Sequence, residues 1–312
     1  MGLLRYSADR RTLAIVGSWF VVEAALWSID GHPWLTAGLF SAACVGAFLA
    51  AVATHNTIHC PVFHSRTLEA LWKCVLTLAY GHPIGSFVPG HNLSHHRHLE
   101  TRADVMRTSK ARARWNLINI VTFFPSISGA MLRSEIGYVR FAWRRRARWR
   151  RQLVLESCVL VVAALALAAV DYKRLLWCVV IPHVYAAWGV VTMNLLQHDG
   201  ADTDSPHNHS RSFIGKTVNW LTFNNGFHAV HHLRPGLHWS LLPAAHERLV
   251  VPHTDPRLIE PSLPAYLFRT YVFPGRRVRF DGRPVVLVEA GADAPWYGKY
   301  APATAQTEGS SS

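Results

Sequence analysis

The chain has 312 residues, of which half are hydrophobic and only 16% are charged, and its formal net charge is +13. This composition is too apolar for an ordinary soluble domain, and nucleic-acid binding would explain the positive charge but not the long apolar runs. Apolar runs with a basic polar face are typical of an integral membrane protein. The five cysteines form no C-x-x-C pair, so the sequence indicates no disulfide framework, zinc ribbon or iron–sulfur cluster.

Four apolar runs are each near the ~20 residues that a membrane-spanning helix needs. Arginines precede the first run, so the positive-inside rule places the N-terminus in the cytoplasm, and four crossings return the chain there. Glu23 interrupts the first run, either as a hydrogen-bonded structural residue or as part of a site within the membrane. The four predicted spans are Leu13–Ile29, Trp34–Thr54, Leu153–Val170 and Leu175–Leu196.

The segments between the second and third runs are predicted to lie at the membrane surface. Arg66–Tyr80 has the pattern of an amphipathic interfacial helix. Trp115–Leu132 is moderately apolar but contains asparagine, proline and serine, which predicts a re-entrant or interfacial pair of short helices. The basic run Arg144–Arg151 is interpreted as an anchor for anionic lipid head groups or as a docking site for an acidic redox partner.

Histidines cluster where these segments meet the cytoplasmic face. Spacings of three and four residues place side chains on one face of a helix, so each cluster can present several imidazoles together. Independent surface histidines would have no reason to follow the membrane topology in this way. By contrast, His207 and His209 lie in a polar loop and are predicted to be exposed to solvent. The clustered residues are His55 and His59, then His91, His95 and His96, then His198, and finally His228, His231 and His232.

Nine clustered imidazoles predict two metal ions. A single ion takes about four to six ligands, and a structural zinc site is satisfied by four. All-nitrogen ligation with room for dioxygen points to iron. The Glu-x-x-His pairs of soluble di-iron proteins are absent, and His246-Glu247 is not followed by the histidine of a zinc protease motif. His238 falls outside the repeated spacing and is predicted to be structural or to support a ligand.

The motifs HNTIH, HNLSHH and HAVHH resemble the three histidine boxes of the membrane fatty-acid desaturase and hydroxylase superfamily, over about residues 10–245. The resemblance implies an all-α integral membrane fold. Its four transmembrane helices, with interfacial helices, would carry a cytoplasmic helical cap that holds a di-iron site. It implies a multi-pass protein of the cell (inner) membrane, with both termini and the active site in the cytoplasm.

The pair Asn194-x-x-x-His198 is similar to a further element of acyl-CoA desaturases. The resemblance implies that His198 is a ninth ligand and that Asn194 reaches a metal through water. Polar side chains behind the ligands often orient them, and Asp199, Asn224 and Asn225 are candidates for that role. Beyond the metal ligands, no catalytic residue is predicted.

The function expected from these features is an O2-dependent acyl-lipid desaturase that introduces a double bond into an acyl chain. A hydroxylase or ketolase on a lipid-like substrate is the alternative, and a non-enzymatic metal-binding or transport protein is a third. The His-Pro-Gly-Gly signature of a fused cytochrome b5 and ferredoxin cysteines are both absent. Electrons are therefore expected from a separate ferredoxin or cytochrome b5 type donor with its reductase. No nucleic acid partner is expected.

Three parts are predicted along the chain. Residues 1–250 form the membrane and cap domain. Residues 251–300 form a C-terminal cytoplasmic extension, in which Val278–Val288 has the pattern of a small hairpin turning at Asp281-Gly282. Residues 301–312 have the composition of a disordered tail.

Overall fold

The computed structural model describes residues 2–287, 289 and 291–298, and this part of the chain is mostly helical, as predicted. The longer helices are α1 (Asp9–Ser28), α2 (Pro33–His59), α3 (Arg66–Tyr80), α6 (Asn116–Ala142), α7 (Ala147–Arg174) and α8 (Ile181–His198). The shorter ones are α4 (Ile84–Val88), α5 (His96–His98), α9 (Lys216–Leu221), α10 (His228–Leu233), α11 (Leu242–Leu249) and α12 (Leu263–Leu267). Strands β1 (Ser212–Phe213) and β2 (Ile259–Glu260) pair in parallel. Wide π-type turns span Pro89–His95, Leu175–Val180 and Phe268–Val272, and 3-10 turns span Thr108–Lys110, Trp239–Leu241 and Pro256–Leu258.

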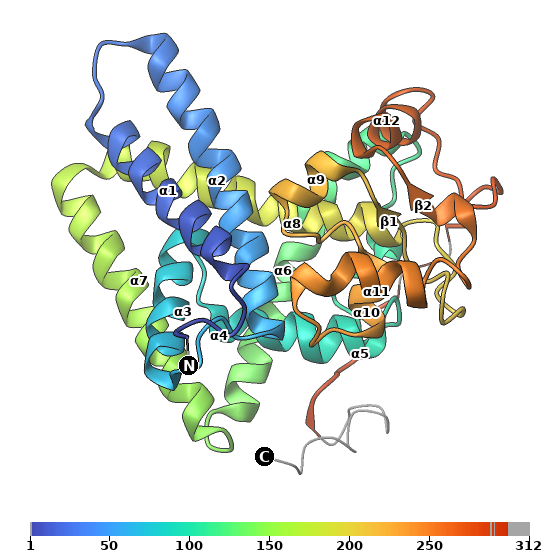
Figure 1. Ribbon diagram of the computed structural model, residues 1–312, viewed down its shortest axis with the longest axis horizontal. Helices are drawn as coiled ribbons and strands as arrows, with labels where there is room; N and C mark the ends of the chain where they lie inside the picture. The colour runs from blue at the N-terminus through green and yellow to red at the C-terminus, as the bar shows by residue number, and fades with distance from the viewer. Residues whose placement is uncertain (1, 288, 290, 299–312) are drawn as a thin grey trace.

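The molecule has two parts that α8 joins. Helices α1, α2 and α7 extend together on one side, and α9 to α12 with the two strands form a compact part on the other (Figure 1). Helix α2 packs against both α1 and α8. Its inner face is built from small residues, since Ala47, Ala50 and Ala53 are fully buried. Small side chains let helix backbones approach closely, which is how apolar helices associate without large core residues.

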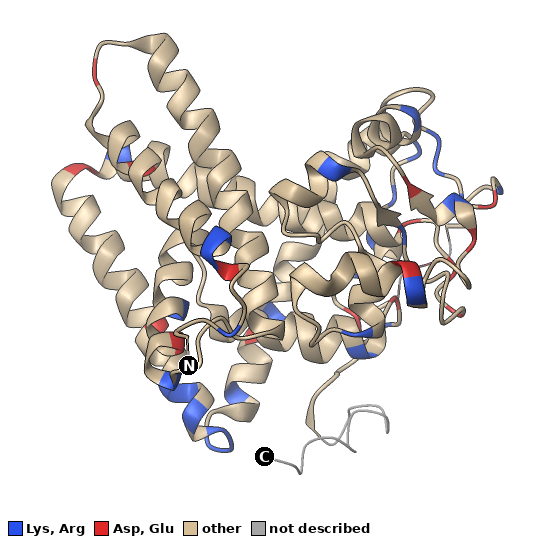
Figure 2. Cartoon of the chain, viewed as in Figure 1, with Lys and Arg blue, Asp and Glu red and all other residues tan. Residues whose placement is uncertain are grey.

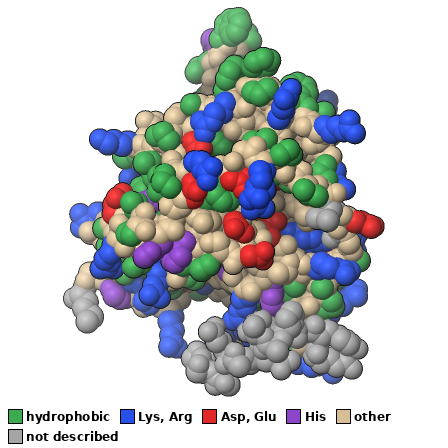
Figure 3. Space-filling view, turned by 90° about the vertical axis from the view of Figure 1, so that its right-hand side faces the viewer, with side chains coloured by type: hydrophobic (Ala, Val, Ile, Leu, Met, Phe, Trp, Pro, Cys, Tyr) green, Lys and Arg blue, Asp and Glu red, His purple; other side chains and the backbone are tan. Residues whose placement is uncertain are grey.

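Charge is distributed unevenly over these two parts. Long stretches of α1, α2 and α7 carry few charged residues, whereas several basic residues lie at the turn between α6 and α7 (Figure 2). The end of the molecule formed by the compact part displays cationic, acidic and histidine side chains together (Figure 3). On α7 the apolar residues Val161, Val162, Leu165 and Val170 are each more than half exposed. Exposed apolar surface of this kind marks a membrane or protein contact.

Two helical stretches within the described residues are long and apolar enough to cross a membrane. One is α2, and the other is the continuous stretch Ala147–His198. The second stretch bends at Asp171, whose backbone is extended (φ −160°, ψ 101°), so it folds back on itself there. This bend lies in the loop predicted between the third and fourth spans. The count of four spans stays a prediction.

The region predicted as a pair of short helices is instead the single helix α6, and that prediction was wrong. Pro125 lies inside it and cannot donate a backbone hydrogen bond. The helix nevertheless continues, and the hydroxyl groups of Ser126 and Ser128 donate to the carbonyls of Phe123 and Phe124 at 2.6 Å each.

By contrast, α3 has the bounds predicted, Arg66–Tyr80. The side chain of Ser65 caps its start and Gly81, at φ 76°, ends it.

The C-terminal extension wraps back onto the loops near the histidines. Residues 277–285 make a tight antiparallel turn, in which Arg279 N–H donates to the Arg283 carbonyl at 2.7 Å. The buried side chain of Arg277 donates to the Asp199 carboxylate at 2.9 and 3.0 Å and to the carbonyl of Thr108 at 2.9 Å. The end of the predicted hairpin, Val288, and the predicted tail at 301–312 lie outside the described residues.

Candidate metal centre

The first histidine box occupies the last turn of α2. His55 and His59 are four residues apart, so both imidazoles lie on one side of the helix, with ring centroids 5.0 Å apart. Behind them, His55 Nδ1 is 3.4 Å from the Asn56 side-chain oxygen. Both rings point toward the second box, since His55 and His59 lie 4.6 and 5.2 Å from the ring of His91.

The second box lies on a wide helical turn rather than on an α-helix. The N–H of His96 donates to the carbonyl of His91, a bond across five residues. Residues five apart are therefore in phase, and the Nε2 atoms of His91 and His96 lie 3.0 Å apart. Sequence reasoning had placed His91 and His95 together because they are four apart. The structure separates them, and His95 faces the other side.

The third box is the helix α10. His228 and His232 are one turn apart, and their Nε2 atoms are separated by 3.1 Å. His228 also lies 2.8 Å from His198, the last residue of α8. His231 points away from these, and its Nε2 lies 3.2 Å from that of His96.

The nine predicted histidines thus come together as two adjoining groups. Within each group the candidate ligand atoms all lie within 4.8 Å of one another, and each group can hold a metal ion. The groups touch, because the rings of His96 and His232 stack at 4.3 Å. The five-histidine group is His55, His59, His91, His96 and His231, and the four-histidine group is His95, His198, His228 and His232.

The chemistry of both groups fits bound transition-metal ions. Burial and the neighbouring imidazoles hold the pKa values of His91, His96, His228, His231 and His232 well below the ordinary 6.5. The rings are therefore neutral, which is the form that binds metal. The buried Nε2 atoms of His59 and His95 have no hydrogen-bond partner. Nitrogens that share an ion at ~2.0–2.1 Å lie ~3 Å apart, as several Nε2 pairs do here.

A family comparison agrees with this geometry. The family model described as fatty acid desaturase matches residues 32–259, which is most of the chain. The chain belongs to the fatty acid desaturase family. Membership implies a membrane-associated oxidoreductase of the desaturase and hydroxylase type, whose members typically carry two iron ions. A search of curated proteins found no match to the chain.

Asp104 is a residue of this site that the sequence analysis missed. It lies nine residues beyond His95, and its Oδ2 accepts a hydrogen bond from His95 Nδ1 at 2.9 Å, with both side chains fully buried. The backbone N–H groups of Glu100 and Met106 also donate to this carboxylate. Although burial opposes it, the nearby His95 with these donors holds the pKa of Asp104 below its usual value. The carboxylate thereby aims His95 Nε2 into the four-histidine group.

The predicted supporting residues contact other partners. Asp199 pairs with Arg277 through its carboxylate. Asn224 donates to the carbonyl of Trp239 at 3.1 Å. Asn225 donates to the side-chain oxygen of Asn56, beside His55, at 2.9 Å, so it reaches a histidine only through a second residue.

Three further polar residues near the histidine boxes make contacts that fix their positions. Asn194 donates to the carbonyl of Met106 at 3.0 Å. His209 is buried, contrary to the prediction, and its carbonyl accepts from His198 Nδ1 at 3.1 Å. His238 contacts Asp9 at 3.1 Å and stacks on Tyr6, which ties α1 to the segment after the third box. Nothing in the local sequence distinguished buried His209 from half-buried His207.

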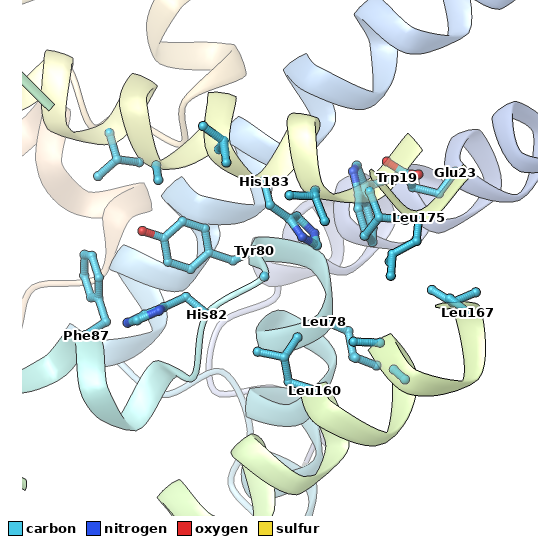
Figure 4. A pocket seen from close by; sticks show the side chains of 18 of the residues that line it. Trp19, Glu23, Leu78, Tyr80, His82, Phe87, Leu160, Leu167, Leu175 and His183 are labelled. Atoms are coloured by element: carbon cyan, nitrogen blue, oxygen red, sulfur yellow. The ribbon is translucent and has the colours of Figure 1, made fainter. Parts of the chain in front are cut away.

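An apolar cavity reaches the two groups from the helical part. A small cavity of about 50 Å³ is bordered by His55, His91, His228 and Asn194. A larger one of about 750 Å³ runs between α1, α3, α6, α7 and α8 (Figure 4). Met106 and Val190 line both, so the two cavities adjoin. The larger volume is within the ~300–1,000 Å³ typical of ligand pockets.

Proposed function

We propose that the protein is an O2-dependent di-iron membrane enzyme that introduces a double bond into an acyl chain. The observation that carries the proposal is the pair of neutral imidazole groups beside a small cavity that adjoins a large apolar one. The cavity suits a hydrocarbon chain, and the donor groups suit metals that activate oxygen. The family match supports the same class of reaction.

The histidine groups are the proposed iron sites. All-nitrogen ligation by neutral imidazole suits iron, and a pair of ions suits a reaction that removes two hydrogens. The two iron ions would supply the oxidising power, drawn from O2 and external electrons, that an unactivated C–H bond requires. His55, His59, His91, His96 and His231 would hold one ion, and His95, His198, His228 and His232 the other.

The chain itself positions the substrate and excludes water. Apolar side chains on α6, α7 and α8 surround most of the large cavity, so an acyl chain would lie in dry surroundings. Asp104 keeps His95 in one orientation, and the Asn56–Asn225 pair backs His55. Asn194 borders the small cavity, and its amide oxygen would hold a water beside the metals.

In the membrane, four spans would hold the site at the cytoplasmic face of the cell (inner) membrane with both termini inside. The helices α1, α2, α7 and α8 are the proposed spans. The residues from 199 onward, together with the second box, would form the cytoplasmic cap. The arginines at the turn between α6 and α7 lie where anionic head groups would meet the protein.

The electron donor is proposed to be a separate ferredoxin or cytochrome b5 type protein with its reductase. The mixed but strongly basic polar surface would favour an acidic partner by electrostatic attraction.

Mass spectrometry of lipids from cells that produce the protein tests this function. Wild-type cells are expected to contain a lipid that is two hydrogens lighter, and cells with His231→Ala are expected to lack it. The matched control is His64→Ala, because His64 is exposed and lies outside both groups. A gain of one oxygen would establish the hydroxylase alternative instead. An unchanged lipid profile, with no iron in the purified protein, would reject the proposal.

A further inference from the structure

A buried carboxyl group without a partner lines the large cavity, far from the histidines. Glu23, on α1, is 8% exposed, and neither of its oxygens has a hydrogen-bond partner within the described residues. Figure 4 shows its side chain beside Trp19 and near Leu175, at one end of the cavity. A polar group buried without a hydrogen bond is costly, so a partner for this carboxyl is expected in the cavity.

A second unpaired polar atom lines the same cavity on the other side of Trp19. Trp19 precedes Glu23 by one helical turn, and its indole stacks on the ring of His183 with centroids 5.7 Å apart. His183, from α8, also lines the cavity, and its buried Nε2 has no partner. The carboxyl and the imidazole therefore flank one tryptophan.

The surroundings of His183 make its free nitrogen an acceptor. Its ring faces the last turn of α3, where helix carbonyls lack partners. A Cβ atom on Gly81 would lie only 2.3 Å from Nδ1, so this nitrogen faces the end of α3. A neutral imidazole that donates through Nδ1 accepts through Nε2.

Within the part of the chain that the structure describes, no lysine or arginine pairs with Glu23. Arg174 is engaged, because it binds Asp30 at 2.6 and 2.7 Å and the carbonyl of Trp27. Close to Glu23 lie Cys44 and Cys178, and a thiol is only a weak donor. The missing partner is thus a hydrogen-bond donor that enters the cavity with a ligand.

We propose that Glu23 binds a hydroxyl group at the remote end of an otherwise apolar substrate chain, with His183 completing the polar end of the cavity on the other side of Trp19. The proposal rests on the proposed function, whose substrate it makes more specific. A hydroxyl fits better than an ammonium group, because a buried carboxyl group without a cationic partner keeps its proton, and a neutral carboxyl group pairs with a hydroxyl without any charge entering the apolar cavity. A plain hydrocarbon chain would leave the Glu23 carboxyl group unpaired.

The position of this pair also predicts where the chain would be oxidised. Trp19 Nε1 donates to the carbonyl of Ala43 at 3.3 Å, and Ala43 precedes His55 on α2 by twelve residues. At ~1.5 Å per residue the pair lies roughly 18 Å from the histidines along the helix. An anchored hydroxyl would therefore hold one region of the chain beside the metals.

Equilibrium binding to the purified full-length protein tests the proposal without iron or oxygen. The probes are radiolabelled methyl palmitate and its terminally hydroxylated analogue, which differ only by the hydroxyl. Wild type is expected to bind the hydroxylated chain about tenfold more tightly, the effect of a hydrogen bond to a buried carboxyl group that otherwise has no partner. Glu23→Leu is expected to remove that preference while methyl palmitate still binds. Glu23→Gln keeps an acceptor oxygen and is expected to retain part of it.

Glu135→Gln is the matched control, because Glu135 lines the same cavity but lies 3.5 Å from His82. It is expected to leave the hydroxyl preference unchanged. Equal binding of the two probes by wild type, binding of neither, or a preference that survives Glu23→Leu would each overturn the proposal. The lipid analysis of the proposed function is independent of this result, so either one can fail while the other stands.

Discussion

At the scale of single residues, the orientation of each imidazole depends on what lies behind it. His95 shows this most clearly, since Asp104 accepts from its Nδ1 and leaves Nε2 unpartnered toward the other three histidines of its group. A carboxylate behind a ligating imidazole fixes the tautomer and makes the ring a better ligand. The four-histidine group should therefore depend on Asp104 although that residue binds no metal itself.

Replacing Asp104 by asparagine is expected to lower metal affinity of the four-histidine group by ~10–100-fold, because the charge behind His95 is lost. The measurement is titration of the metal-free protein with ferrous or cobalt(II) ions, followed by metal analysis of each variant. Asp204→Asn provides the control, as Asp204 is exposed in the loop after α8. If Asp104→Asn still bound two metal ions with equal affinity, the Asp104 carboxylate would not influence the metal affinity of the four-histidine group.

At the scale of elements, the hydrogen-bonding pattern of a turn decides which metal-binding group each histidine of the second box joins. The turn Pro89–His95 has a five-residue bond at its end, which sends His91 and His96 to one group and His95 to the other. The C-terminal segment then holds the surrounding loops, because Arg277 joins Asp199, next to His198, to the carbonyls of Thr108 and Ala111. Segments from three parts of the chain meet at this one side chain.

Arg277→Ala is expected to destabilise the fold by ~3–5 kcal/mol, because it leaves the buried Asp199 carboxylate without its charge partner. Arg283→Ala is the comparison, since Arg283 pairs with Asp281 but is largely exposed and should cost less than ~1 kcal/mol. Thermal or denaturant unfolding in detergent measures both. Equal losses in the two variants would contradict a special role for the buried pair.

At the scale of the whole molecule, folding collects many imidazoles in a buried space where they stay neutral. Burial first, and then their mutual proximity, lowers the pKa values of His91, His96, His228, His231 and His232 below 6.5. The unfolded chain takes up protons at these residues as the pH falls through 6.5, whereas the folded chain does not. The free energy of unfolding is therefore highest, as far as these histidines affect it, above about pH 6.5, and it decreases progressively below that pH.

The unfolding temperature of the metal-free protein is accordingly expected to fall as the pH is lowered from about 8 to about 5, and most of this decrease is expected below pH 6.5. Each histidine that is neutral only in the fold contributes up to ~1.4 kcal/mol per pH unit. Bound iron should delay the loss to lower pH, because metal competes with protons for the same nitrogens. His64→Ala should follow the wild-type profile. An unfolding temperature that does not change below pH 6.5 would contradict this account.

The sequence by itself determined the helical character, the helix α3 and the nine histidines that come together. These follow from local patterns, since apolar runs make helices and spacings of three or four put side chains on one face. Tertiary structure alone decided how the nine divide into groups of five and four, because a π-type turn shifts the phase of the second box. It also decided that Asp104 supports His95, that Arg277 meets Asp199, and that Glu23 faces a cavity without a partner. Such contacts join residues distant along the chain or held by an irregular turn, and no local periodicity encodes them.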